Sequence, residues 1–187
     1  LKQKSRRAAL EEADAAEQKL GRELDAARQR LSVLKELERN MDGYQNSVKT
    51  VMRAAATRRL RGILGPVSAL LRVEPGRETA IETALGGALQ NIVVENEQAA
   101  KAAISLLKSE NAGRATFLPL DTVQPGVFRG RLSGSARLAS SLVQADSRYA
   151  NIVSNLLGRI VVVDEIHEAS RVARELGYHN KVVTLDG

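Results

Sequence analysis

The sequence predicts an α/β (α+β) fold in which a long coiled-coil helix precedes a two-lobed domain built from two similar halves. Three observations predict it. Apolar residues recur at coiled-coil spacing near the start of the chain, and the order helix, strand, helix, strand then occurs twice. Apolar residues make up 43% of the 187 residues, which is enough for a globular core.

Residues 1–61 are predicted to form one coiled-coil arm helix. No proline occurs before Pro66, and residues with high helix propensity dominate the composition. The apolar stripe resumes in a shifted register through Tyr44, Val48 and Val51. A helix this long with one stripe needs a partner helix, unless it lies on its own domain as an ordinary amphipathic helix. The seam residues, which alternate three- and four-residue steps, are Leu10, Ala13, Glu17, Leu20, Leu24, Ala27, Leu31 and Leu34.

Residues 62–120 are predicted to form the first lobe. The apolar stretch 63–73, which contains Gly65 and Pro66, indicates a strand with an irregular edge. Periodicity then predicts a helix over 78–85, a buried strand over 91–95, a helix over 97–108 and a strand over 115–118.

Residues 121–141 are rich in Gly and Ser and are predicted to be a flexible connector. Residues 142–187 are predicted to form the second lobe. Its expected elements are a helix over 149–157, a strand over 160–163, a helix over 165–176 and a strand over 182–185.

The two lobes align as an internal repeat. Shifted by 69 positions, Val94 falls on Val163 and Leu107 on Leu176. After a further slip of two residues, 114–118 falls on 181–185. Four elements in the same order favour a true repeat over a chance match of apolar positions.

Catalytic chemistry has little support in the sequence. There is no cysteine, and the only imidazoles, His167 and His179, have no neighbouring ligands at metal-binding spacing. Residues 43–50 imitate a phosphate-binding loop, but Val48 stands where the second glycine is required. We therefore expect a non-enzyme that needs no cofactor and no metal, and we disfavour a small α/β nucleotide-binding protein. No apolar run is long enough to span a membrane, so we expect a cytoplasmic protein.

Positive charge is concentrated in two windows. The net charge is +6, yet residues 1–42 hold ten Lys and Arg against nine Asp and Glu. Residues 43–73 contain six basic residues and no acidic one, and residues 122–145 contain three basic residues and no acidic one. Clustered positive charge attracts a polyanion, so these windows predict nonspecific DNA contact. The alternatives are a plain solvated face and a surface that docks an acidic protein. The predicted DNA-binding residues are Lys49, Arg53, Arg58, Arg59, Arg61, Arg129 and Arg131.

Several segments resemble the hinge domain of the structural maintenance of chromosomes (SMC) proteins, in its bacterial form. They are 85–95 (LGGALQNIVVE), 100–104 (AKAAI), 113–120 (GRATFLPL) and 183–187 (VTLDG), supported by the matches at 43–49, Tyr149 and 156–158. The likeness covers the chain from about residue 41 to its end, and the preceding helix is similar to the adjoining coiled-coil arm.

The resemblance implies a role in chromosome condensation and segregation. SMC proteins are ATPases whose ATP-binding heads lie far from the hinge, so we expect no ATP hydrolysis from these residues. It also implies a homodimer with a second hinge copy, DNA contact, a returning coiled-coil helix of the same protein as partner of the arm, and association with the nucleoid. In the family, a Gly-rich segment that contributes to dimerisation follows the Leu-Asp-Gly motif with which this sequence ends. The expected dimer interface lies at two strand edges, formed by Ala115, Thr116, Phe117, Val182, Val183, Thr184 and Leu185.

Overall fold

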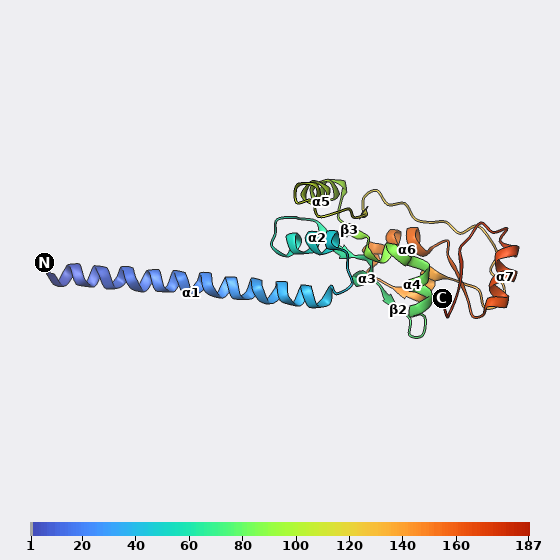
Figure 1. Ribbon diagram of the computed structural model, residues 1–187, viewed down its shortest axis with the longest axis horizontal. Helices are drawn as coiled ribbons and strands as arrows, with labels where there is room; N and C mark the ends of the chain where they lie inside the picture. Colours follow the sequence, from blue (N-terminus) through green and yellow to red (C-terminus); the bar gives the residue numbers. More distant parts are fainter. Residues whose placement is uncertain (1) are drawn as a thin grey trace. The chain divides into compact units, whose positions relative to one another are not determined.

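The computed structural model describes residues 2–187, and the chain divides into two compact units, Leu1–Gly43 and Tyr44–Gly187 (Figure 1). The first unit is the helix α1 (Lys2–Asn40), which at ~1.5 Å per residue is about 58 Å long. Its predicted seam is exposed: the side chains of Leu10 and Leu20 are each 64% accessible, and Leu24 and Leu31 are more than half accessible. An exposed leucine stripe of this length is typical of a helix that pairs with another helix.

The predicted continuous helix over 1–61 is wrong. α1 ends at Asn40, Gly43 adopts φ +91°, and a second helix, α2 (Asn46–Ala56), begins after the extended residue Gln45. A glycine in this left-handed conformation ends helices because it has no Cβ to clash with the backbone. The arm-to-domain boundary therefore lies at residues 43 and 44 rather than at 61, and the shift of register in the stripe marks this break.

α2 is part of the folded domain. It buries Ser47, Val48, Val51 and Ala54, and it packs against α5 (Glu97–Ser109). The backbone N–H of Gln45 donates to Oε1 of Gln90 over 2.8 Å, and the hydroxyls of Tyr44 and Ser68 hydrogen-bond to each other. These contacts fix the start of α2.

The first lobe contains a three-stranded sheet in the order β1-β3-β4. β1 runs antiparallel to β3, with a bulge between Ile63 and Gly65, and β3 runs parallel to β4. The predicted single strand over 63–73 is in fact two strands separated by a helical turn. The remaining elements are β1 (Ile63–Pro66), α3 (Val67–Leu70), β2 (Arg72–Val73), α4 (Glu78–Leu85), the 3-10 helix η1 (Gly86–Gln90), β3 (Ile92–Val94) and β4 (Phe117–Pro119).

The second lobe repeats this layout with the sheet order β5-β7-β8. β5 is antiparallel to β7, and β7 is parallel to β8, as in the first lobe. The repeat is therefore confirmed, and it begins earlier than predicted, because β5 and the turn after it lie inside 121–141. The elements are β5 (Arg137–Leu138), η2 (Ala139–Leu142), β6 (Val143–Gln144), η3 (Ser147–Tyr149), α6 (Ala150–Leu157), β7 (Val161–Val163), α7 (Ile166–Glu175) and β8 (Val182–Thr184).

The strand registers correct the predicted alignment of the last strands. Ile92 pairs with Phe117, and Val161 pairs with Val182. The offset between the lobes is thus 69 residues for the central strands (161 minus 92) and 65 for the last strands (182 minus 117). The slip is four residues rather than two, because α7 has 10 residues against 13 in α5 and the loop that follows it is one residue shorter.

One hydrophobic core is shared by both lobes. α4 and α6 lie between the two sheets, and Ile81 and Val93 of the first lobe pack in one cluster with Ile152, Leu157 and Val162 of the second. β2 and β6, which come from different lobes, pair antiparallel. A second cluster, which includes Val161 and Val163, lies between the β5-β7-β8 sheet and α7. The two halves therefore fold as one block.

The connector is held against the second lobe rather than flexible. The hydroxyl of Ser154 donates to the carbonyl of Gly126 over 2.9 Å, and Nδ2 of Asn155 donates to the carbonyl of Gln124 over 2.8 Å. A Cβ on Gly126 would lie 2.4 Å from the carbonyl oxygen of Ser154, and one on Gly134 would lie 2.0 Å from Oε1 of Glu168. The connector glycines are therefore required for close approach, which corrects the prediction of flexibility.

We expect Gly126→Ala to lower the free energy of unfolding by about 1–3 kcal/mol, because the new methyl must displace the end of α6. The matched control is Gly87→Ala, where a Cβ meets no atom within 4 Å. Urea unfolding of both variants checks this. Equal stability of the two would show that the connector does not need its close contact with α6.

Candidate nucleic-acid and dimer interfaces

The first basic window forms a turn after α2 rather than the end of a long helix. Arg58 has φ +60°, and the backbone N–H groups of Arg59 and Leu60 both donate to the carbonyl of Ala54. This reversal leaves the side chains of Arg58 and Arg61 exposed. On α2 itself, Lys49 and Arg53 are half-buried, so they are less accessible than the helical pattern predicted.

The first window has carboxylates beside it in space. Nη2 of Arg59 lies 2.6 Å from Oε1 of Glu110, just after the end of α5. The carboxylate of Glu95 lies beside the backbone of Gly62, where a Cβ would be 3.3 Å from Oε2. The positive charge of this window is therefore lower than its acid-free sequence predicted, and Arg59 does not act as a free cation.

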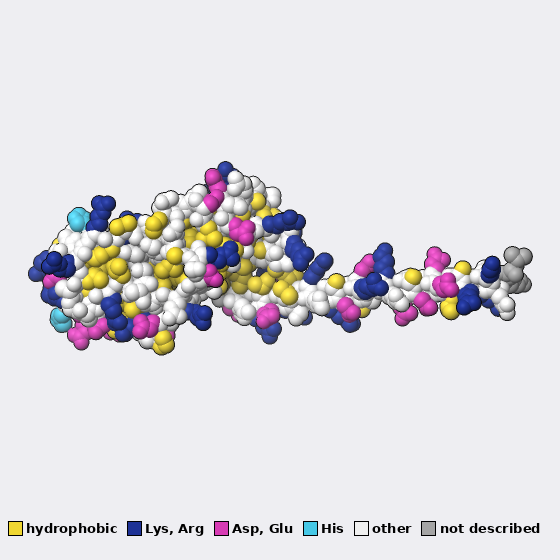
Figure 2. Space-filling model, turned by 180° about the vertical axis from the view of Figure 1, so that it is seen from behind, with side chains coloured by type: hydrophobic (Ala, Val, Ile, Leu, Met, Phe, Trp, Pro, Cys, Tyr) yellow, Lys and Arg dark blue, Asp and Glu magenta, His cyan; other side chains and the backbone are white. Residues whose placement is uncertain are grey.

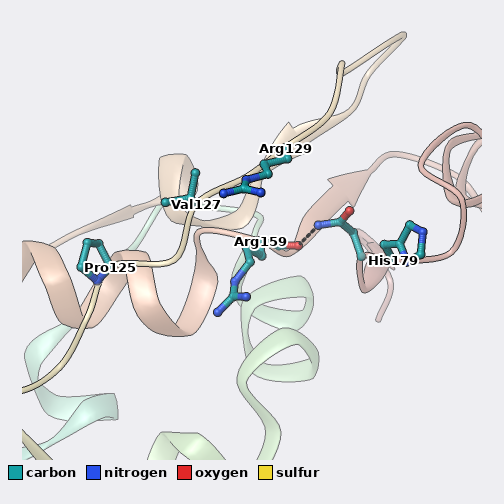
Figure 3. Close-up of a pocket in the computed structure, with 6 residues that line it drawn as sticks. Pro125, Val127, Arg129, Arg159 and His179 are labelled. Carbon is teal, nitrogen blue, oxygen red and sulfur yellow. Dashed lines mark hydrogen bonds between the residues drawn. The ribbon is translucent and has the colours of Figure 1, made fainter.

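The second basic window adjoins two hollows on the second lobe. A cavity of about 600 Å³ is lined by Pro125, Val127, Arg129, Arg159, His179 and Asn180 (Figure 3). A neighbouring hollow of about 320 Å³ is lined in part by Arg129, Arg131 and Glu175. Arg137, the third cation of the window, lies 3.9 Å from a carboxylate oxygen of Asp164.

Sequence reasoning missed Arg159 and His179 as members of this cluster. Each stands in the turn before a strand, Arg159 before β7 and His179 before β8. Because β7 and β8 are parallel, these turns meet at the same edge of the sheet. The side-chain amide of Asn180 donates to the carbonyl of Arg159 over 2.9 Å, and this hydrogen bond joins the two turns. The available signal was an arginine and a histidine, each placed just before one of two parallel strands.

The structure does not bring the two predicted basic windows together. The first window lies at the α2 and α5 end of the domain, whereas the second lies at the end that carries α7 (Figure 1). At the α7 end, Lys and Arg side chains gather on the surface near the imidazoles (left in Figure 2). The domain thus has two separate cationic surfaces.

A network of charged hydrogen bonds fastens the connector to α7. Glu168 accepts from the backbone N–H of Ser135 over 2.7 Å and also from its hydroxyl. Glu175 accepts from the hydroxyl of Ser133 over 2.6 Å, and Arg171 bridges both carboxylates. The hydrogen bonds from Ser135 lower the pKa of Glu168, and those from Ser133 and Arg171 lower the pKa of Glu175, because they favour the ionised form.

The candidate dimer edges are the outermost strands β4 and β8 of the two sheets. The N–H of Leu120 donates to the carbonyl of Val94, and the N–H of Leu185 donates to the carbonyl of Val163. Because the backbone nitrogens of successive strand residues point to opposite sides, those of positions 119 and 184, one residue earlier, are directed away from the sheet. Position 119 is a proline with no N–H, whereas Thr184 keeps its donor. The β8 edge is therefore better equipped to pair with another strand.

The residues predicted for the dimer interface fall on or beside these edges. Phe117 belongs to β4, and Val182, Val183 and Thr184 form β8. Ala115 and Thr116 precede β4, and Leu185 follows β8, so the expected strand boundaries were wrong there. Val183 is buried in the shared core, which leaves it unavailable for a surface contact.

Within residues 2–187, no group of three or more His, Asp or Glu side chains is placed to hold a metal ion. No helix in the same range is long and apolar enough to cross a bilayer.

Comparison with known proteins identifies the class. The family model of the SMC protein flexible hinge domain matches residues 60–173. Over 177 residues the chain is 39% identical to the chromosome partition protein Smc of Desulfitobacterium hafniense, a match that covers 91% of this chain and 15% of that protein. The corresponding protein of Bacillus subtilis is 36% identical over 168 residues, which cover 86% of this chain and 14% of the relative.

Solved hinge domains share the fold. The asymmetric dimer of the Geobacillus stearothermophilus SMC hinge domain matches with a TM-score of 0.75 and 39% identity, over 86% of this chain and 67% of that one. The Pyrococcus furiosus SMC hinge domain matches with a TM-score of 0.65 and 29% identity, over 85% of this chain and 81% of that one. The chain belongs to the SMC hinge-domain family. It spans about 15% of the length of the curated relatives it matches.

We expect Glu168→Gln combined with Glu175→Gln to reduce the acid sensitivity of the domain. Because both folded-state pKa values lie below the ordinary value of 4.5, the two carboxylates stabilise the fold above that pH. This stability is lost as the pH falls through the lowered pKa values. Thermal unfolding between pH 7 and pH 3 should show a smaller fall in Tm for the variant than for the wild type, with a lower starting Tm. The control is Glu82→Gln on the exposed face of α4, which should keep the wild-type profile.

Proposed function

We propose that this chain is the dimerising hinge of a chromosome-organising SMC protein, where it joins two coiled-coil arms and contacts DNA nonspecifically. The observation that carries the proposal is the likeness to a hinge domain solved as a dimer, together with two outermost sheet strands in the same domain. The partner chains we propose are a second copy of the hinge and, for α1, the returning helix of the same protein. The exposed leucine stripe of α1 supports the second pairing.

We propose chromosome condensation and segregation as the role of the whole protein. The curated relatives are named chromosome partition proteins, and this chain corresponds to a small part of each. In this arrangement the hinge supplies mechanical connection rather than catalysis, and ATP hydrolysis belongs to other parts of the protein.

DNA contact is supported by the cations that remain exposed after the pairing of Arg59. Arg58 and Arg61 lie in one turn and are both exposed, while Lys49 is half-buried on the preceding helix. Arginine side chains in such a turn can reach phosphate groups without reading bases, which suits nonspecific binding. The competing proposal, a connector that docks an acidic protein, is favoured by the same charges and differs only in its ligand.

Dimerisation through β8 predicts that Thr184→Pro weakens self-association, because it removes the N–H that points away from the sheet. Thr184→Val keeps this N–H and serves as the matched control. Sedimentation equilibrium at micromolar concentration should show a dimer for the wild type and the valine variant, with a larger dissociation constant for the proline variant. A proline variant that associates as the wild type does would place the interface elsewhere.

DNA contact through the first window predicts that Arg58→Glu with Arg61→Glu weakens duplex binding. Loss of two phosphate contacts should reduce the slope of log K against log salt by about 1.8. Fluorescence anisotropy with a 30-base-pair duplex between 50 and 200 mM salt measures this. The control is Arg59→Gln, because Arg59 is already paired with Glu110. An unchanged slope in the double variant removes this window from the DNA-contacting surface.

A further inference from the structure

We propose that the cavity lined by Pro125, Val127, Arg129, Arg159, His179 and Asn180, called here the lobe-2 groove, binds the phosphodiester backbone of a nucleic acid. This inference rests on the DNA contact proposed above and gives it a second, separate location. The ligand class is a chain of phosphate groups rather than a single small anion.

The groove is built where three segments meet. The turns before β7 and β8 supply Arg159, His179 and Asn180, and the connector supplies Arg129 from above (Figure 3). The connector is held there by Ser154 and Asn155 of α6, which bond the carbonyls of Gly126 and Gln124. These contacts preorganise the groove, so a ligand need not order it.

The charge of the groove is uncompensated. Among residues 2–187, neither Arg129 nor Arg159 forms an ion pair, and no carboxylate lines the cavity. The carboxylate of Glu175, which lines the adjoining hollow, has one oxygen bonded to Ser133 and the other to Arg171. Two free guanidinium groups with a histidine and an amide are donors that match phosphate oxygens.

The same place in the first lobe is partly covered by the start of α2, beside a hollow of about 550 Å³ lined in part by Gly113 and Arg114. By the offsets of the repeat, Gln90 corresponds to Arg159, and Arg114 corresponds to His179. In the first lobe, Oε1 of Gln90 accepts the N–H of Gln45, and Ser47 approaches Gly113, so the start of α2 contacts this edge of the sheet. In the second lobe the connector passes this edge, with Gly126 beside Arg159, and leaves a cavity that Arg129 and Arg159 line. This difference between two related edges points to a ligand rather than to a packing requirement.

The size and lining fit a chain of phosphates with its sugars. A cavity of about 600 Å³ exceeds the space that one phosphate needs, and Arg129 and Arg159 lie on different segments along it. Pro125 and Val127 provide an apolar wall, and Val127 is 62% exposed. Sugars can rest against such a wall while the arginines hold phosphates, a division typical of backbone contact.

The test uses Arg129→Gln with Arg159→Gln in the 187-residue chain. The matched control is Arg22→Gln with Arg148→Gln, which removes the same net charge from exposed positions outside both basic windows. Anisotropy titrations use a 30-base-pair duplex, a 30-nucleotide single strand and poly-glutamate of similar charge, at several salt concentrations. We expect the groove variant to bind at least one nucleic acid about tenfold more weakly in 0.1 M salt, with a salt slope smaller by about 1.4–1.8, and the control to bind within about twofold of the wild type. Thermal unfolding verifies that both variants are folded.

Each other outcome overturns the proposal in a distinct way. Equal losses in the groove and control variants would mean that only total charge matters. Tight, groove-dependent binding of poly-glutamate, or displacement of the nucleic acid by equimolar inorganic phosphate or ATP, would assign the groove to an acidic protein or to a small phosphate. If the wild type binds DNA and only the Arg58 and Arg61 variant weakens binding, the proposed function stands and the groove proposal fails. If the wild type binds no nucleic acid at low salt, DNA contact itself fails, while dimerisation remains separately measurable.

Discussion

The hinge depends on a core that neither lobe can complete alone. The main sheet of each lobe has three strands of two to four residues, which is too little surface to be stable in isolation. α4 of the first lobe and α6 of the second fill the space between the sheets, and Ile81, Ile152 and Leu157 are almost wholly inaccessible there. Nζ of Lys181 also donates to the carbonyls of Thr83 and Ala84 at the end of α4, across the lobe boundary. Because the lobes share this core, strand edges and cationic surfaces on different lobes are held at fixed positions within the domain.

The candidate functional features lie where the two lobes differ. The lobes have the same strand order and directions, yet the outward position of the last strand is Pro119 in one and Thr184 in the other. The amino ends of the parallel strands contact the start of α2 in the first lobe and the connector in the second, where Arg159 lines a cavity. A duplicated scaffold thus keeps its packing residues and diverges at edges and turns, where a substitution does not disturb the core.

Sequence reasoning recovered the features that depend on local pattern. The periods of apolar residues located α4, α5, α6 and α7 and the strands between them, because each element buries one regular face. It missed the helix break at Gly43, since one glycine in a helical pattern is often tolerated, and it misaligned β4 with β8, since loop lengths leave no periodic trace. The pairing of Arg59 with Glu110, 51 residues away, and the meeting of Arg159 with His179 depend on tertiary folding, so no sequence window contains them.

Because the two cationic surfaces are separate, the proposed DNA contact is divided between two places on the domain. The sequence predicted seven DNA-contacting cations in two windows, and a surface that joined the two windows would bind a duplex at one place. Pairing of Arg59 and partial burial of Lys49 weaken the first surface, while Arg159 and His179 enlarge the second. Two modest contacts on one rigid domain act together only when a strand can reach both, because the second contact is then made at a high effective concentration. The affinity of such a surface for a nucleic acid depends on the length and path of the strand more than on its sequence.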